Sequence, residues 1–266
     1  MKALALDFDG VISNSAVESF LIALQTQVDL QPNSPLAALV KSLFTDQPIP
    51  EADCVAATSA YQAFIDLMPL GNGAEDYGVA MAMVERGITT DDQQSYNALR
   101  SEYDLDYLLE FHNRFYATRH ALAAAYPREW RRLMRPYPGI TASLREWSQG
   151  VRLALATAKD RPSVDALLED YGIADLFPSS LILDNEAGSN KTAHLNAIAD
   201  RLSIELHEAT FIDDKVNHLD SVAPLGVRCV LAGWGYNTPR EHALAEERGY
   251  LVCSLDDCQR QLFDAC

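Results

Sequence analysis

The first hydrophobic run of the chain is short and ends at a pair of acidic residues. Ala3–Leu6 is uninterrupted and apolar, and Asp7 and Asp9 follow it directly. A short apolar run bounded by a turn signal predicts a buried strand. Gly10 then permits a sharp turn of the backbone. We therefore expect a strand whose carboxyl end carries two carboxylates.

Between residues 15 and 136 the apolar positions recur at helical spacing instead. The segments with this spacing are 20–24, 36–43, 61–68, 77–84, 104–115 and 129–133. Proline and glycine separate them, at Pro48, Pro50, Pro69 and Gly71–Gly73. No alternating strand pattern is sustained here, so the spacing predicts an all-helical insert over residues 15–136.

From residue 137 onward, short apolar runs alternate with helical patterns. The predicted strands are 151–156, 181–183, 210–212, 227–232 and 250–252, and the predicted helices are 141–150, 163–171, 191–202, 216–225, 241–248 and 255–262. Such alternation predicts an α/β fold with a Rossmann-like parallel sheet between helices. Residues 1–14 and 137–266 would form this core, with hinges near Ile12–Ser15 and Arg135–Pro138.

Length and charge agree with this division and restrict the partners. A chain of 266 residues fits two modest domains. Lysine and arginine total 21 and aspartate and glutamate 38, which gives a net charge of −17. Nucleic acids and anionic membranes repel such a chain, so we expect neither as a partner. No segment predicts an oligomeric state.

The chain start and the cysteines point to the cytoplasm. Two acids follow the first apolar run too soon for a secretory signal, and no run approaches the ~20 residues of a membrane span. Five cysteines without a Cys-x-x-Cys pair suggest reduced thiols. Cys253 and Cys258 are alternative metal ligands, but neither a second cysteine pair nor a nearby histidine completes a tetrahedral set.

The polar chemistry collects behind the predicted strands, where open parallel sheets place their active sites. The four features are Asp7 with Asp9, Thr157, Lys191 in Gly188–Lys191, and Asp213 with Asp214. Clustered carboxylates are the hard oxygen ligands that Mg²⁺ prefers, and the bound ion leaves positions open for a phosphate. A threonine at a strand-to-helix turn and a lysine supply donors to the phosphoryl oxygens.

Taken singly, these features have ordinary explanations. An Asp-x-Asp is usually a loop feature, Thr157 a strand end, Lys191 a solvated helix start, and the Asp213–Asp214 pair an N-cap. Their joint occurrence in this order favours a phosphoryl-transfer site. There the first carboxylate can attack phosphorus, while the second protonates the leaving oxygen and later deprotonates water.

In this order the features resemble the four motifs of the haloacid dehalogenase superfamily. Asp7-Phe8-Asp9-Gly10-Val11 is similar to its first motif, Thr157 to the second, Lys191 to the third and Phe211–Asp214 to the fourth. The helical insert resembles the cap of the phosphoglycolate phosphatase-like branch.

The resemblance implies a role for each matched residue. Asp7 would be the nucleophile and Asp9 the acid/base. Asp7, the carbonyl of Asp9 and Asp214 would hold Mg²⁺, with Asp213 beside them as a further or alternative ligand. Thr157, the backbone N–H of Ala158 and Lys191 would bind the phosphate.

Two departures from the family pattern stand out. Val11 replaces a frequent threonine, and His218 occupies the position of a frequent further aspartate. Asp9 narrows the reaction, because the family's dehalogenases and phosphonate hydrolases lack an acid there. We therefore expect a phosphoric monoester hydrolase for a small phosphorylated metabolite. The alternatives are a mutase of the β-phosphoglucomutase type and a non-catalytic binding protein.

The insert carries candidates for substrate recognition. The loop Leu70–Gly73 could face the site or be an ordinary interhelical loop. Arg114, Arg119 and His120 could meet an anionic substrate tail or serve structural or solvated roles. Arg128, Arg131, Arg132 and Arg135 could form a basic patch, since their spacing places several on one helix face.

Overall fold

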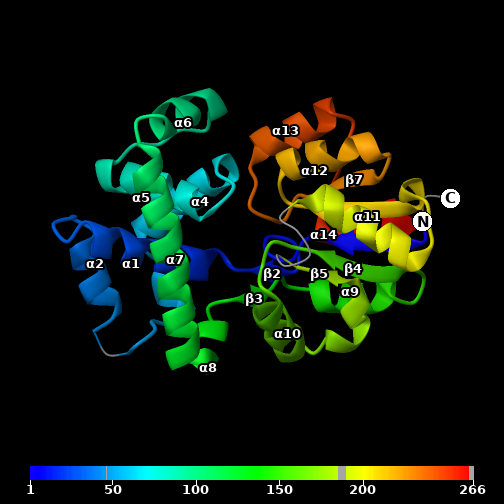
Figure 1. Ribbon diagram of the computed structural model, residues 1–266, viewed down its shortest axis with the longest axis horizontal. Helices are drawn as coiled ribbons and strands as arrows, with labels where there is room; N and C mark the ends of the chain where they lie inside the picture. The colour runs from blue at the N-terminus through cyan, green and yellow to red at the C-terminus, as the bar shows by residue number, and fades with distance from the viewer. Residues whose placement is uncertain (46, 185–189, 264–266) are drawn as a thin grey trace. The chain divides into compact units, whose positions relative to one another are not determined.

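The chain forms two compact units, which Figure 1 shows in a computed structural model. The structure describes residues 1–45, 47–184 and 190–263; Gly188, Ser189 and Cys266 lie outside this part of the chain. The first unit, here called the core unit, comprises Met1–Asn14 and Arg135–Cys266. The second, called the insert, comprises Ser15–Met134. The two units are described separately below.

A six-stranded sheet forms the centre of the core unit, and every neighbouring pair of strands in it is parallel. The strands are β1 (Ala3–Leu6), β4 (Arg152–Ala156), β5 (Ile182–Leu183), β6 (Ala209–Asp213), β7 (Arg228–Ala232) and β8 (Leu251–Cys253). Their order is β5-β4-β1-β6-β7-β8. This confirms the predicted α/β class, and each predicted strand lies within one or two residues of an observed one.

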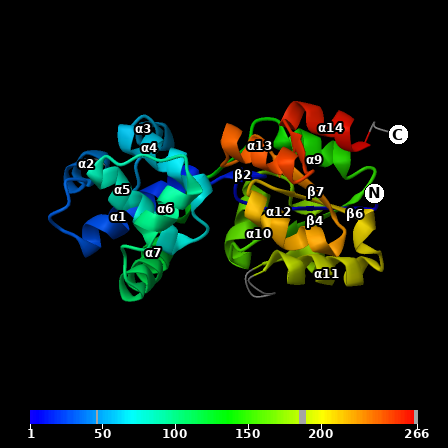
Figure 2. The same ribbon diagram turned by 90° about the horizontal axis from the view of Figure 1, so that it is seen from above.

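Helices cover both faces of this sheet. The helices of the core unit are α9 (Ile140–Trp147), α10 (Arg161–Asp170), α11 (Lys191–Leu202), α12 (Val216–Val222), α13 (Pro239–Glu247) and α14 (Leu255–Phe263). Side chains of α11, α12 and α13 pack against one face. Figure 2 shows α9 and α14 on the side of the sheet opposite α11, where Trp147 stacks on Phe263 at 6.2 Å.

Two short strands lie where the chain leaves the core unit and returns to it. In β2 (Ser13–Asn14) and β3 (Arg135–Pro136), Ser13 pairs with Pro136 and Asn14 with Arg135 in antiparallel register. The Ser13 hydroxyl lies 2.8 Å from the Tyr171 hydroxyl. The predicted hinge segments therefore form a hydrogen-bonded ribbon, and residues 135 and 136, expected in the insert, belong to it.

The described part of the insert is helical, as predicted. Its helices are α1 (Ala16–Leu30), α2 (Ala37–Leu43), α3 (Ala52–Ala56), α4 (Ser59–Leu67), α5 (Ala74–Arg86), α6 (Gln93–Arg100), α7 (Leu105–Ala125) and α8 (Pro127–Arg131). Short 3₁₀ turns occur at Met68–Leu70 here and at Ala174–Leu176, Ser179–Leu181, Leu206–Glu208 and Ala223–Leu225 in the core unit. Phe20, Phe64, Phe111 and Phe115 are fully or almost fully buried and form the aromatic centre of the insert.

Two helices of the insert escaped prediction. Helix α3 has only five residues, and α6 is mostly polar with one buried residue, Tyr96. Short or polar helices give little apolar periodicity, so a pattern search passes over them. The Asp92 side chain, which accepts a hydrogen bond from Ser95 N–H, marks the start of α6 in the sequence.

Candidate active site

The Asp-x-Asp segment continues directly from the central strand. The N–H of Asp7 donates to the carbonyl of Ile212 at 2.9 Å, which extends the pairing of β1 with β6 by one residue. The chain then turns, and the N–H groups of Ile12 and Ser13 both donate to the Phe8 carbonyl at 2.9 Å. Asp7 is thereby buried at the carboxyl edge of the sheet, while the Asp9 side chain is about one-third exposed.

Lys191 joins three strand ends at this edge. Its Nζ lies 2.9 Å from Oδ1 of Asp7 and 3.2 Å from Oδ2 of Asp213, and it donates to the carbonyl of Ala156 at 2.7 Å. The residue is the first of α11, whose N-cap Asn190 accepts from Ala193 N–H at 2.7 Å. Three of the four predicted motifs are therefore in direct contact through one buried ammonium group.

The charges in this cluster shift one another's pKa values. Burial disfavours the charge of Lys191, but Asp213 and Asp7 outweigh it and raise the lysine pKa. Burial also raises the pKa of Asp7, against the opposing effect of Lys191. For Asp213, burial is outweighed by His218 and Lys191, which hold the pKa of that carboxyl well below its ordinary value.

The two adjacent acids of the fourth motif have different surroundings. Asp213 accepts from the N–H of Lys215 at 3.0 Å, and both of its carboxylate oxygens lie within 3.1 Å of His218 Nδ1. Asp7, Asp213 and His218 each offer a ligand atom within 4.8 Å of the others. His218, noted in the sequence as a departure, therefore contacts the carboxylate that also binds Lys191.

Asp214 lies in a space formed by two glycines. A Cβ atom on Gly10 would overlap the Asp214 carboxyl, and one on Gly235 would overlap the Asp214 Cβ and the Gly10 carbonyl. Gly10 also has a φ of +86°. The Asp214 carboxylate accepts from Tyr236 N–H at 3.0 Å, and its pKa is raised well above the ordinary value by burial and by the charges of Asp213 and Asp7.

The loop after β7 forms hydrogen bonds to the turn that follows Asp7 and to the backbone of Asp214. Trp234 Nε1 donates to the carbonyl of Val11 at 2.9 Å, and the Tyr236 hydroxyl donates to the carbonyl of Ser13 at 3.3 Å. Asn237 Nδ2 donates to the carbonyls of Asp214 and Ala232. The structure places Gly233–Tyr236 against the turn that follows Asp7.

Thr157 lies where the sequence predicted, at the end of β4. The residue is buried, and its N–H donates to the Leu183 carbonyl at 2.9 Å. Its hydroxyl oxygen accepts from the N–H of Lys159 at 3.1 Å. Ala158, the next residue, is exposed.

One polar residue of this edge was missed from the sequence. The ammonium of Lys159 lies 3.1 Å and 3.3 Å from the two carboxylate oxygens of Asp9, and its side chain is only 2% exposed. The chain has five lysines, so a lysine two residues after a motif threonine was a usable signal.

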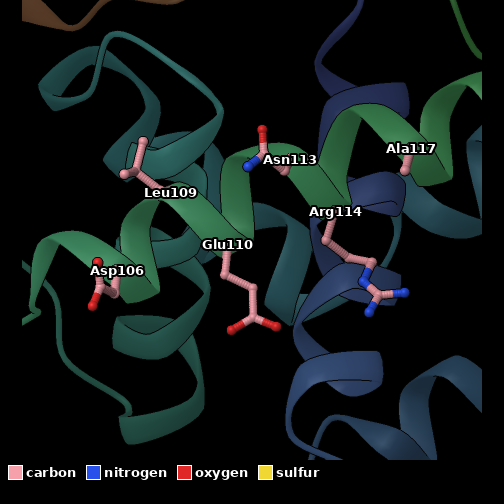
Figure 3. Close-up of a pocket in the computed structure, with 6 residues that line it drawn as sticks. All are labelled: Asp106, Leu109, Glu110, Asn113, Arg114 and Ala117. Carbon is pink, nitrogen blue, oxygen red and sulfur yellow. The ribbon is translucent and has the colours of Figure 1, made fainter.

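The arginine candidates of the insert separate into different roles. Arg119 makes two hydrogen bonds to the buried Glu18, at 2.7 Å and 2.6 Å, and Trp130 Nε1 donates to the same carboxylate. This favours the structural alternative for Arg119. Arg114 and His120 lie on the exposed side of α7, and Figure 3 shows Arg114 pointing to the same side of that helix as Glu110.

The predicted basic helix face is present over fewer residues than expected: Arg128 and Arg131, three positions apart, both lie on α8. Helix α8 ends at Arg131, Arg132 follows it, and Arg135 lies in β3 of the core unit. After this helix the chain turns, with Leu133 N–H donating to the Trp130 carbonyl and Met134 N–H to the Arg131 carbonyl, before it reaches the ribbon. The four arginines therefore do not share one helix.

The loop Leu70–Gly73 is anchored within the insert. Asn72 N–H donates to Oδ2 of Asp76 at 2.8 Å, and Gln93 Nε2 donates to the Leu70 carbonyl. Arg100 Nε holds the other Asp76 oxygen at 2.6 Å. These bonds give the loop a defined conformation, and its role in recognition stays a prediction.

Comparison with known proteins decides the family. The family model of haloacid dehalogenase-like hydrolases matches residues 1–226. The chain belongs to the haloacid dehalogenase-like hydrolase family. This confirms the resemblance on which the four motifs were matched.

Relatives of this haloacid dehalogenase-like hydrolase carry two kinds of name. The chain is 28% identical over 163 residues to phosphoglycolate phosphatase of Pseudomonas savastanoi, which spans 59% of this chain and 53% of that protein. It is 34% identical over 92 residues to phosphoglycolate phosphatase of Pectobacterium atrosepticum, spanning 34% and 38%. Tyrosine-protein kinase PtkA of Mycobacterium tuberculosis is 30% identical over 99 residues, spanning 36% and 33%. The chain therefore matches only a third to about half of the length of these relatives.

Solved structures agree on the fold of the whole chain. A predicted phosphoglycolate phosphatase from Haemophilus somnus matches 98% of this chain and 97% of its own, with a TM-score of 0.62 and 17% identity. A haloacid dehalogenase-like family hydrolase from Streptococcus pneumoniae matches 95% and 93%, with a TM-score of 0.58 and 14% identity. Within the described residues, no helix is both long and apolar enough to cross a membrane.

Proposed function

We propose that this hydrolase is a Mg²⁺-dependent phosphatase of small phosphorylated metabolites that forms an aspartyl phosphate on Asp7. The observation that carries the proposal is the contact of Lys191 with both Asp7 and Asp213. Asp9 lies two residues after Asp7 in the chain. A nucleophilic carboxylate, an acid/base and a cation then share one edge of the sheet. The phosphoglycolate phosphatases among the relatives support the substrate class.

The donor set fits a magnesium ion. Three buried carboxylates, Asp7, Asp213 and Asp214, gather at this edge. Burial and the neighbouring charges of Asp213 and Asp7 raise the pKa of Asp214, and a small hard cation would offset this gathering of negative charge. We assign Asp214 as the direct ligand together with Asp7 and the carbonyl of Asp9, because Asp213 already binds Lys191, His218 and a backbone N–H. When bound, Mg²⁺ supplies positive charge to the carboxylates and the phosphoryl oxygens.

The protein residues carry the reaction in two steps. In the first, a carboxylate oxygen of Asp7 forms a bond to phosphorus while the ester P–O bond breaks, and Asp9 gives its proton to the departing alcohol oxygen. In the second, Asp9 takes a proton from water as the water oxygen bonds to phosphorus and the Asp7–phosphorus bond breaks. Inorganic phosphate leaves, and both aspartates return to their starting states.

Lys191, Thr157 and the Ala158 N–H would hold the phosphoryl group during these steps. The lysine carries a charge that Asp213 and Asp7 stabilise, as its raised pKa indicates. Thr157 offers a hydroxyl proton, since its oxygen already accepts from Lys159. We also propose a cytoplasmic location, which the free thiols of Cys54, Cys229, Cys253 and Cys258 support.

Replacement of the nucleophile tests this function. Asp7→Asn keeps the shape of the side chain and removes the attacking oxygen anion, so we expect phosphate release to fall by at least about 1,000-fold. The measurement is inorganic phosphate release from a panel of metabolite phosphates with Mg²⁺. Asp256→Asn, at an exposed position of α14, is the matched control and should leave turnover unchanged. Unchanged turnover in Asp7→Asn would refute the mechanism.

Product analysis separates the remaining alternatives. A phosphatase converts a sugar phosphate into free sugar and phosphate, whereas a mutase returns an isomerised ester. A wild-type protein that turns over no phosphomonoester with Mg²⁺ would instead support a binding protein that has kept the fold.

A further inference from the structure

Lys159 is a buried cation that pairs with the carboxylate of Asp9. Its Nζ contacts both oxygens of Asp9, at 3.1 Å and 3.3 Å, and the side chain is 2% exposed. Burying an ammonium group is unfavourable unless an opposite charge and hydrogen bonds compensate it. Asp9 provides this compensation in its ionised form, the form it has after giving up its proton, and the two side chains then hold each other.

The backbone of Lys159 is fixed at both ends. Its N–H donates to the Thr157 hydroxyl at 3.1 Å, and Thr157 itself continues β4 by a bond to the Leu183 carbonyl. The next residue, Asp160, caps α10 by accepting from Ser163 N–H and Ser163 Oγ. The lysine side chain thus starts from a rigid strand-to-helix turn, not from a loosely held loop.

The two lysines of the site contact different aspartates of the first motif. Lys191 contacts Asp7, and Lys159 contacts Asp9. The Asp9 side chain is 34% exposed, and a carboxylate of that exposure samples several rotamers unless a neighbour restrains it. A buried anchor on both oxygens removes much of that freedom.

We propose that Lys159 is a positioning residue that holds the Asp9 carboxyl in place for proton transfer. The proposal rests on the proposed function, in which Asp9 protonates the ester oxygen as the P–O bond breaks and Asp7 bonds to phosphorus. The released proton and electron pair both go to the alcohol oxygen, and Asp9 recovers a proton from the attacking water. Misplacing Asp9 slows the reaction most where the leaving oxygen depends on protonation.

This dependence gives a test that a purely structural role would not pass. An alkyl alkoxide is a poor leaving group and needs the proton, whereas p-nitrophenolate leaves without it. The two substrates are p-nitrophenyl phosphate and the alkyl phosphomonoester that the wild type hydrolyses fastest. We expect Lys159→Met to lower kcat for the alkyl ester by about 10- to 100-fold and for the aryl ester by less than about threefold, with KM little changed.

Three further variants complete the experiment. Lys159→Arg keeps a cation beside Asp9 and should recover much of the alkyl-ester rate. The double variant Asp9→Asn with Lys159→Met should be no slower than Asp9→Asn alone, because the lysine acts through Asp9. Lys2→Met is the matched control: Lys2 is exposed at the amino end of β1, paired with Glu208, and should keep wild-type rates on both esters.

Each other outcome overturns the assignment. An equal loss on both esters, with the fold intact by circular dichroism, means that Lys159 supports the site generally. A higher KM with unchanged kcat makes it a substrate-binding cation. If Lys159→Met fails to fold, Lys159→Gln is measured in its place. A change in kcat that is the same for both esters, or no change for either, would refute the role. A wild type inactive on every ester defeats the proposed function itself, which is a different result from any of these.

Discussion

Asp214 and its two glycine neighbours show how closely single residues are matched at this site. Neither Gly10 nor Gly235 leaves room for a Cβ atom against Asp214. Gly10 also needs its left-handed backbone conformation, so two separate requirements fall on that residue. Gly235 carries the steric requirement alone, which makes it the cleaner position to change.

Gly235→Ala is expected to weaken Mg²⁺ binding. The added methyl group must displace Asp214 or the Gly10 carbonyl, and overpacking of this kind costs about 1–3 kcal/mol. If the displacement falls on the metal ligand, affinity drops by about tenfold or more. Titration calorimetry with Mg²⁺ in the absence of substrate measures this directly.

Gly150→Ala is the matched control for that measurement. A Cβ atom there meets only the Trp147 carbonyl at 3.9 Å, an ordinary contact. Wild-type Mg²⁺ affinity in Gly235→Ala would contradict this prediction: either the methyl group displaces only the Gly10 carbonyl, or Asp214 does not hold the ion.

The sequence identified the residues of this site by their types, but their contacts depend on the fold. Asp7, Lys191 and Asp213 stood out because each follows or precedes a recognisable strand or helix. The pairing of Lys159 with Asp9 could not be read in the same way, because the two residues are 150 positions apart. Which of Asp213 and Asp214 binds Lys191 also depends on side-chain direction: successive residues at the end of β6 point to opposite sides, and the sequence does not show which side meets Lys191.

Among the helices, α1, α7 and α8 are joined by one buried carboxylate. Glu18 is fully buried on α1, and it accepts from Arg119 of α7 and Trp130 of α8. The Arg119 guanidinium also lies over the Phe115 ring at 4.8 Å. A charge held this way is stabilised only while both partners are present.

Glu18→Gln should therefore destabilise the insert by about 3 kcal/mol, because it leaves a mostly buried arginine without its counter-charge. Urea unfolding followed by tryptophan fluorescence measures the change. Asp175→Asn, which removes an exposed ion pair with Arg145, is the control and should change stability by no more than about 0.5 kcal/mol. Equal effects of the two substitutions would contradict this role of Glu18.

Helix α13 begins with a reciprocal cap that responds to pH. Glu241 is buried and accepts from Thr238 N–H at 2.9 Å and Thr238 Oγ1 at 2.6 Å, while Arg240 Nε donates to its other oxygen. Burial opposes the charge, but the bonds from Thr238 and Arg240 outweigh it and lower the Glu241 pKa below its ordinary 4.5.

A lowered folded-state pKa stabilises the protein above the ordinary glutamate pKa and loses this effect as the pH falls through the folded value. Between about pH 6 and about pH 3, the wild type should lose more unfolding free energy than Glu241→Gln. Denaturation at a series of pH values tests this, with the exposed Glu247→Gln of the same helix as control. Parallel curves for wild type and Glu241→Gln would show that the carboxylate is not stabilised in the folded state.

Element prediction succeeded where apolar periodicity was strong and failed where it was weak. The strands of the core unit are short buried runs, and their positions were predicted to within one or two residues. Helix α7 runs ten residues past its predicted end, because its last turns are rich in alanine and carry few large apolar residues. The ribbon of β2 and β3 has two residues in each strand, which is too short for an alternating pattern of apolar and polar residues to be recognised.

For the whole molecule, the order of strands was beyond the sequence. Strand β1 is first in the chain, yet it lies between β4 and β6 near the middle of the sheet. Alternating strands and helices predict parallel pairing, but several strand orders satisfy that rule equally. The strand order that the protein adopts is selected by packing among residues far apart in the chain.

The ribbon of β2 and β3 has a consequence for how this sheet assembles during folding. Leu4 pairs with Leu153, about 150 residues away, and closing so long a loop is entropically unfavourable. Asn14 and Arg135 lie opposite each other, so an insert that folds first leaves an effective loop of about 30 residues. That shortening lowers the closure entropy term by about 1.5 kcal/mol. By shortening this loop, an insert that folds before the sheet would bring the first strand within reach of partners synthesised long after it.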